Sequence, residues 1–124
     1  MNLVTGNTET ITKTHRGWTV GHMHTGLAGT TAFEVKQWRY DDPIDYGWKK
    51  FLGTEYIVIY QGVLEIQLVL DGDKETVTLR GSCQDYVIFS PGVTKKVVVL
   101  ETPAFGVTVR WPSSLGLNEV VKGS

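Results

Sequence analysis

The chain has 124 residues, of which 41% are hydrophobic and 20% are charged, and its formal net charge is -1. This length suits one domain with one core, and the ordinary globular composition excludes a disordered chain. Nucleic-acid-binding proteins carry a basic surplus, so the nearly neutral charge predicts no nucleic-acid partner.

The N-terminal segment lacks both the basic stretch and the apolar stretch of a secretory signal peptide. No apolar run is long enough to span a bilayer, so we expect no membrane partner. The one cysteine, Cys83, cannot form a disulfide within the chain. Together these features favour a cytoplasmic protein.

Short segments with alternating apolar and polar residues predict β-strands along most of the chain. An N-terminal arm (1–16) precedes them, and a C-terminal tail (113–124) without a clear period is expected to run over the surface. The strands fall in 16–24, 31–40, 63–70, 75–80, 85–89, 95–100 and 105–111. Asp71-Gly72 predicts a tight hairpin turn, because both residues tolerate positive φ angles. "SPG" and "ETPA" predict further turns.

About eight or nine strands without a substantial helix predict an all-β domain over residues 17–112. Such a chain folds as a sandwich or a barrel, since each sheet must bury one face.

The segment "YGWKKFLGTEYIVIYQG" (46–62) resembles the first motif of the cupin superfamily, whose members are small double-sheet jelly-roll barrels. In that motif a His-x-His precedes a glutamate, and a glycine follows the glutamate after six residues. Here Glu55 and Gly62 keep this spacing. The His-x-His positions are held by Lys49 and Phe51, or by Trp48 and Lys50 on the longer spacing.

The segment "QDYVIFSPGVTK" (84–95) resembles the second cupin motif. Gly92 matches the glycine of that motif, and Lys95 stands at its histidine position. Together with "RGWTVGHM", "FEVKQW" and "VTVRWPS", the likeness extends over 15–114. It points to a group of short, single-domain cupins that lack the usual metal-binding histidines. The resemblance implies a double-stranded β-helix (jelly-roll) fold and a homodimer, with Glu55 left from the usual metal ligands.

The only histidines at chelating spacing are His22 and His24 in "GHMH". Residues i and i+2 of a strand share a face, so two such imidazoles could converge on one metal ion. Two ligands do not make a tight site. The alternative is one buried, hydrogen-bonded imidazole and one near a rim. We therefore expect no cofactor, with a divalent metal on His22 and His24 as the alternative.

Lys95 would hold an anion rather than a metal ion, because an ammonium group has no lone pair. It could bind a ligand, pair with Glu55, or face solvent. Glu55 could act as a general base or only pair with a lysine. Arg110 would be the best anion anchor in the chain if its side chain points inward, since the guanidinium binds carboxylates through two hydrogen bonds.

Residues 34, 36, 38 and 40 share one strand face, which carries Glu34 and Lys36 followed by two aromatic side chains. Such a face suits a polar small molecule, with the charges fixing its orientation and the aromatic rings covering its apolar part. A solvated strand or a subunit interface would use the same residues.

The function that these observations favour is a metal-independent binding module for a small polar or anionic ligand inside the barrel. The predicted ligand-binding residues are His22, His24, Glu34, Lys36, Glu55, Lys95 and Arg110. The alternative is a small-molecule enzyme, either a sugar-type isomerase or epimerase with Glu55 and His22 as catalytic candidates, or a metal-dependent cupin enzyme on His22 and His24. A third alternative is an interaction protein whose barrel is filled by side chains.

Overall fold

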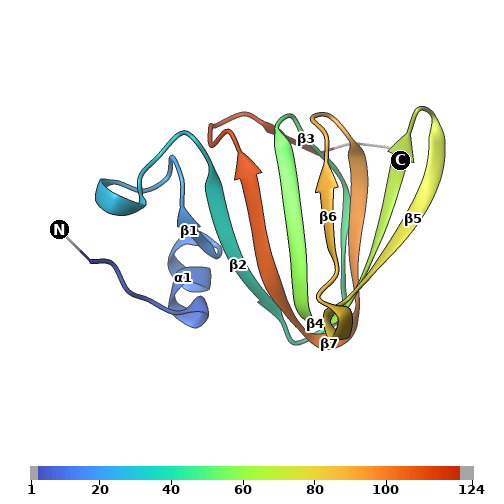
Figure 1. Cartoon of the computed structure of the whole chain (residues 1–124), viewed down its shortest axis with the longest axis horizontal. Coiled ribbons are helices and arrows are strands. Elements are labelled where there is room, and N and C mark those ends of the chain that lie inside the picture. Colours follow the sequence, from blue (N-terminus) through green and yellow to red (C-terminus); the bar gives the residue numbers. More distant parts are fainter. Residues whose placement is uncertain (1–2, 121–124) are drawn as a thin grey trace.

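A computed structural model describes residues 3–120, which form one curled antiparallel sheet with a short helix at one end (Figure 1). The elements in chain order are α1 (Thr8–His15), β1 (Trp18–Val20), the 3-10 helix η1 (Gly26–Ala28), β2 (Glu34–Tyr40), β3 (Ile44–Phe51), β4 (Thr54–Leu70), β5 (Asp73–Arg80), the 3-10 helix η2 (Gly81–Cys83), β6 (Tyr86–Phe89), β7 (Thr94–Trp111) and β8 (Asn118–Val120). Within residues 3–120, no helix has the length and apolar character needed to cross a membrane.

The two long strands β4 and β7 pair along most of their length and form the spine of the sheet. One half of β4 also pairs with β6 and the other half with β5, whereas β7 pairs with β2 through one half and β3 through the other. Both strands bend around Gly62, where the register between them shifts. Only glycine fits there, because its φ is +88° and a Cβ would lie 2.6 Å from the Glu101 carbonyl oxygen.

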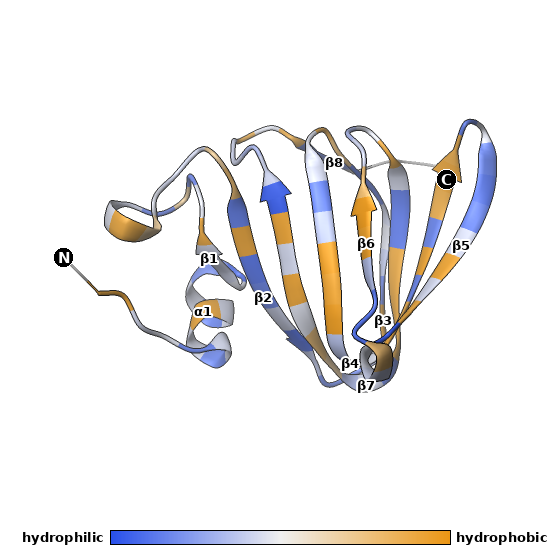
Figure 2. Cartoon of the chain, viewed as in Figure 1, coloured by the Kyte–Doolittle hydropathy of each residue, from blue (hydrophilic) through white to orange (hydrophobic). Residues whose placement is uncertain are grey.

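The inner face of the curled sheet holds the core, and the alternation of apolar and polar residues along the strands is visible in Figure 2. In β4 the alternation predicted for 63–70 is confirmed as far as Leu68, since Leu64, Ile66 and Leu68 are buried, whereas Leu70 at the strand end is exposed. The predicted hairpin is also confirmed. Asp71 and Gly72 have φ angles of 51° and 85° and connect β4 to β5.

The strands β3 and β8 lie outside the predicted strand ranges, and the helix α1 was not predicted either. Its first turn is capped by Asn7, whose side chain accepts a hydrogen bond of 2.9 Å from the Thr10 N–H. Lys13 and Glu9 pair across one turn at 3.3 Å. The helix buries no residue, so its sequence has no apolar period to reveal it.

Several predicted boundaries were wrong, and β4 begins at Thr54 rather than at residue 63. β1 ends at Val20, before His22 and His24, so "GHMH" is not strand. The "ETPA" turn is instead part of the continuous strand β7, because Pro103 lies at the bend, where it has no partner on β4. Part of the expected surface tail forms β8, which pairs with β3.

Candidate functional site

The inner face of the sheet surrounds an open cavity of about 140 Å³. A water needs roughly 10–15 Å³ by this kind of measure, so the cavity has room for several waters or a small molecule. Five cationic side chains line it, with one carboxylate, Glu55. The cations are Lys36, Lys49, Lys50, Lys95 and Arg110. This volume argues against a barrel that is simply filled by its own side chains.

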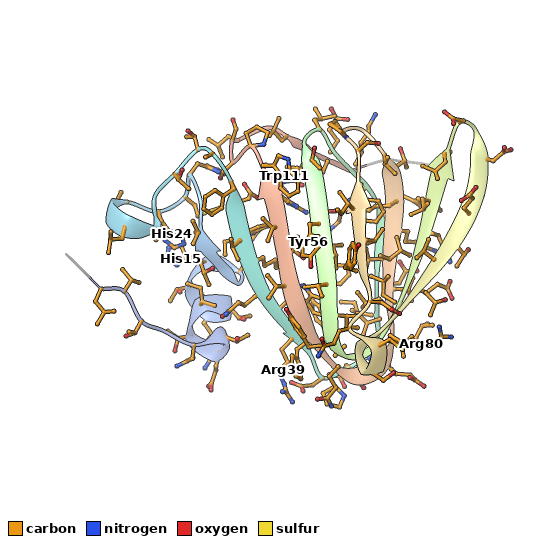
Figure 3. All side chains as sticks on the ribbon, in the orientation of Figure 1. His15, His24, Arg39, Tyr56, Arg80 and Trp111 are labelled. Atoms are coloured by element: carbon orange, nitrogen blue, oxygen red, sulfur yellow. The ribbon has the colours of Figure 1, made fainter. Side chains whose placement is uncertain are left out.

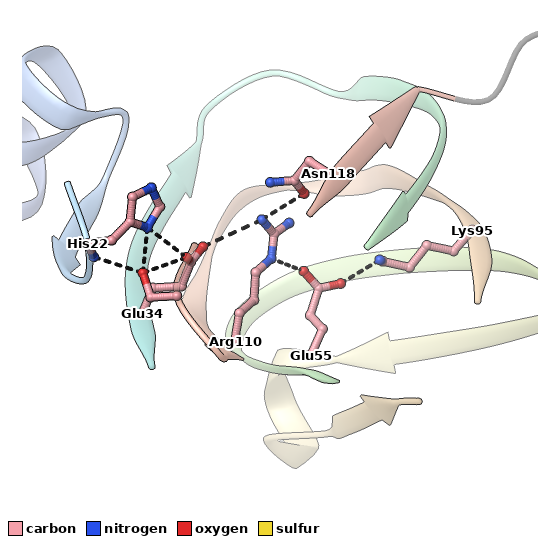
Figure 4. Close-up of polar contacts among 7 residues, drawn as sticks. His22, Glu34, Glu55, Lys95, Arg110 and Asn118 are labelled. Atoms are coloured by element: carbon pink, nitrogen blue, oxygen red, sulfur yellow. Dashed lines mark hydrogen bonds and ion pairs between the residues drawn. The ribbon is translucent and has the colours of Figure 1, made fainter. Parts of the chain in front are cut away.

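Glu55 lies between two cations on the inner face of the sheet (Figure 4). Its Oε1 is 2.5 Å from the Lys95 Nζ, and its Oε2 accepts a hydrogen bond from the Arg110 Nε. The side chains of Glu55 and Lys95 are 2% and 7% exposed, so this is a buried ion pair. The contact between Glu55 and Arg110 forms because β4 pairs directly with β7, which places these two residues opposite each other in the register.

The two cations determine the protonation state of Glu55. Burial by itself would raise the pKa of the Glu55 carboxyl, but the opposite charges of Arg110 and Lys95 outweigh burial and hold the pKa below its usual value. The carboxylate is therefore ionised at neutral pH. It is a weak base, because it is already stabilised by two cations.

Lys36 and Lys49 are the cavity cations that have no carboxylate within 4.0 Å among residues 3–120. Lys49 lies at the mouth, with its Nζ 5.2 Å from the centre of the Tyr46 ring. Lys36 is half-buried on β2. Burial, followed by the charges of Arg110 and Lys49, lowers the pKa of Lys36 to about 8.

Aromatic rings form one wall of the cavity. Trp38 stacks on Tyr40 with ring centres 5.6 Å apart, and Tyr40 meets the edge of Tyr46 at 5.4 Å. The Trp38 Nε1 donates a hydrogen bond of 3.1 Å to the Thr108 hydroxyl, which satisfies its polar group. The cavity therefore combines a cationic side with an aromatic side.

A second polar cluster joins His22, Ser113 and Glu34, and Figure 4 shows His22 beside Glu34 on the side of Arg110 away from Lys95. The fully buried Ser113 hydroxyl donates to Glu34 Oε1 at 2.9 Å and lies 2.6 Å from His22 Nδ1. Glu34 also reaches Arg110 at 3.8 Å. This cluster connects the segment after β1 to the strand that carries Arg110, and it does not line the cavity.

His24 lies apart from this cluster. Its Nε2 is 2.7 Å from the Trp18 carbonyl oxygen, and its ring packs against His15 of α1 at 4.4 Å between centres. Figure 3 shows these two histidines together on the side of the molecule that carries α1. His22 and His24 thus have different partners, because the chain turns between them instead of continuing β1.

The structure gathers four of the seven predicted ligand-binding residues in the cavity lining: Lys36, Glu55, Lys95 and Arg110. His22 and Glu34 lie behind Arg110, and His24 lies near α1. Sequence reasoning missed Lys49, Lys50, Tyr46 and Asn118 as lining residues. Lys49 and Lys50 could have been found, since both occupy histidine positions of the cupin motif in one or the other spacing.

The positions that hold a metal ion in the resembling motifs do not suit one here. Lys49 and Lys95 are lysines, Phe51 has no donor atom, and both oxygens of Glu55 contact cations. A divalent ion needs three or more N, O or S donors with free lone pairs. In the part of the chain that the structure describes, no three His, Cys, Asp or Glu side chains are grouped for this purpose.

The solved structures that resemble this chain include several of oxalate decarboxylase from Bacillus subtilis. A tryptophan-to-phenylalanine variant and the enzyme at pH 4.6 both superpose with a TM-score of 0.65 at 14% identity, covering 74% and 73% of this chain. A structure from work on the Mn(II) centres of that enzyme gives a TM-score of 0.61 at 15% identity over 70%. This chain spans about a quarter of the length of these proteins.

No protein-family model matches the sequence, and no curated protein matches it. At this level of identity the structural likeness establishes the fold alone. The chain has the all-β jelly-roll fold of a cupin domain, as the two sequence motifs implied.

Proposed function

We propose that this protein is a metal-independent binding module that holds a small organic anion in the cavity of its cupin-like barrel. The observation that carries the proposal is the charge of the cavity, where four lysines and one arginine face a single carboxylate. Like charges gathered in a partly buried site repel one another, and an anion relieves that repulsion.

The cations divide into two groups by their partners. Lys95 and Arg110 are held by Glu55, and Lys50 lies 3.6 Å from Glu119. Lys36 and Lys49 have no such partner among the described residues and are free to bind a ligand. Arg110 can also contribute, because Glu55 and Asn118 accept from its Nε and Nη1 and the guanidinium has five N–H groups in all.

The size and wall of the cavity restrict the anion. A volume of about 140 Å³ suits a small carboxylate, and the rings of Trp38, Tyr40 and Tyr46 suit a ligand with an apolar part. The structural neighbours are named for their action on oxalate, which is also a small carboxylate. Acid–base catalysis by Glu55 is disfavoured, because its two cationic partners make it a weak base.

The test is titration of the protein with lactate, oxalate and benzoate, followed by calorimetry and by tryptophan fluorescence, for which Trp38 in the cavity wall is a reporter. Lys49→Ala and Lys74→Ala form a matched pair. Both lysines are exposed and lie over an aromatic ring, but only Lys49 lines the cavity.

We expect at least one of these carboxylates to bind with saturation. The Lys49→Ala variant should weaken this binding about threefold or more, and Lys74→Ala should leave it unchanged. Equal effects of the two variants, or the absence of saturable binding of any of the three anions, would contradict the proposal.

A further inference from the structure

Lys36 differs from the other cavity lysines in its surroundings. Its Nζ lies 5.7 Å from the centre of the Trp18 ring, and the same indole also contacts the Arg110 guanidinium at 5.0 Å. Arg110 is opposite Glu34 in the β2–β7 register, and Lys36 is the next inward residue along β2. An amine and a guanidinium are therefore neighbours on the inner face, under one aromatic cover.

The surroundings of Lys36 make its amine easier to deprotonate than an exposed lysine. Burial and the charges of Arg110 on β7 and Lys49 on β3 lower its pKa to about 8, with a smaller contribution from Arg16 after α1, and Glu55 on β4 acts in the opposite direction. Roughly a tenth of the side chain is thus uncharged at pH 7 and about half at pH 8, and a neutral lysine amine is a nucleophile. Lys95 and Lys50 are instead each paired with a carboxylate.

The geometry points to Lys36 as the attachment point of a reversible imine with a small 2-oxo acid, whose carboxylate is held by Arg110 and Lys49. This inference rests on the proposed function, since the bound carboxylate brings the ligand to the amine. In a 2-oxo acid the carbonyl carbon is bonded directly to the carboxylate carbon. A carboxylate placed beside Arg110 therefore puts that carbonyl carbon near the neighbouring Lys36.

The chemistry requires no oxidant, reductant or metal. The Lys36 nitrogen lone pair attacks the carbonyl carbon and forms a C–N bond, while the carbonyl oxygen takes a proton and the nitrogen loses one. The resulting carbinolamine then loses its hydroxyl with a proton, as water, and leaves a C=N bond. Hydrolysis by water from the open cavity reverses each step and releases the 2-oxo acid.

The experiment is reductive trapping with pyruvate and cyanoborohydride, read by intact mass and by peptide mapping of the full chain. Lactate serves as the matched anion, because it has the carboxylate but no carbonyl. Propionaldehyde serves as the matched carbonyl compound without a carboxylate. Lys36→Arg keeps the positive charge and removes the amine, and Lys74→Arg is the control at an exposed lysine.

We expect a single pyruvate adduct on Lys36 that saturates with pyruvate and is suppressed by lactate. Trapping should fall at least tenfold in Lys36→Arg and be unchanged in Lys74→Arg. Labelling by propionaldehyde should not saturate, because this compound lacks the carboxylate that the cavity binds. Adducts spread over the surface lysines, or unchanged trapping in Lys36→Arg, would overturn the inference. If lactate binds but pyruvate is not trapped, the imine is excluded and anion binding stands. If lactate, oxalate and benzoate all fail to bind, the proposed function itself fails.

Discussion

The folded protein partly buries the positive charge of Lys36, and this burial lowers the stability of the fold. Its pKa is about 8 in the folded protein and near 10.5 in an unfolded chain, so between these values the unfolded chain binds more protons. Stability therefore rises with pH across that window, and below pH 8 the folded state carries the full penalty.

The variant Lys36→Met should remove this penalty while keeping most of the length of the side chain. We expect it to raise the free energy of unfolding at pH 7 by about 1–3 kcal/mol, with the gain shrinking toward pH 10. Urea unfolding at both pH values measures the change, and the exposed Lys74→Met is the control. A variant that is less stable than the wild type at pH 7 would show that Lys36 is not destabilising.

Glu55 has the opposite role, since it neutralises two cations that the fold has already buried. Glu55→Gln leaves Lys95 and Arg110 without their carboxylate, and breaking a buried ion pair from one side costs about 3–5 kcal/mol. Urea unfolding at pH 7 checks the loss, with Glu75→Gln on β5 as the exposed control.

The pH dependence of stability provides an independent readout of the same carboxyl. The pKa of Glu55 is held below its ordinary value of 4.5, so its contribution is complete above that pH and is lost as the pH falls below it. Wild-type stability should therefore fall more steeply between pH 5 and pH 3 than that of Glu55→Gln. Parallel curves for the two proteins would contradict the assigned pairing.

At the scale of elements, the sequence correctly predicted those features that depend only on residues close together in the chain. The alternation in β4 and the Asp71-Gly72 turn depend on neighbouring residues, and both were confirmed. The continuity of β7 was missed because Pro103 is normally a turn residue, and only its partner strand shows that it lies at a bend. The helix α1 was missed because its stability depends on a cap and not on an apolar face.

The residues of the candidate site also fall into two groups, those that the sequence could predict and those that it could not. Lys95 could be predicted because it occupies a motif position, and its pairing with Glu55 was one of the predicted alternatives. Lys49 occupies another motif position but was missed as a lining residue. The direction of Arg110 could not be predicted, since it depends on the register of β7 with both β2 and β4. The contact of His22 with Ser113 joins residues 91 positions apart, and no local pattern indicates it.

At the scale of the whole molecule, a chain of formal net charge -1 concentrates positive charge in one cavity. The net charge of the chain does not reveal such a site, because the acidic residues that balance its positive charge are distributed elsewhere over the surface. Anion binding should then depend on the protonation of the cavity, and Lys36 is the lining cation whose pKa is about 8.

A bound carboxylate favours the charged form of Lys36, so binding above pH 8 should be accompanied by uptake of a proton. The affinity for lactate should fall severalfold between pH 7 and pH 9, and added chloride should weaken it at pH 7 through screening. Calorimetry in two buffers with different ionisation enthalpies, HEPES and Tris, measures the proton uptake directly. The Lys36→Met variant should bind more weakly at pH 7 and show neither the pH dependence nor the proton uptake. A wild-type affinity that stays constant from pH 7 to pH 9 would place the anion away from Lys36.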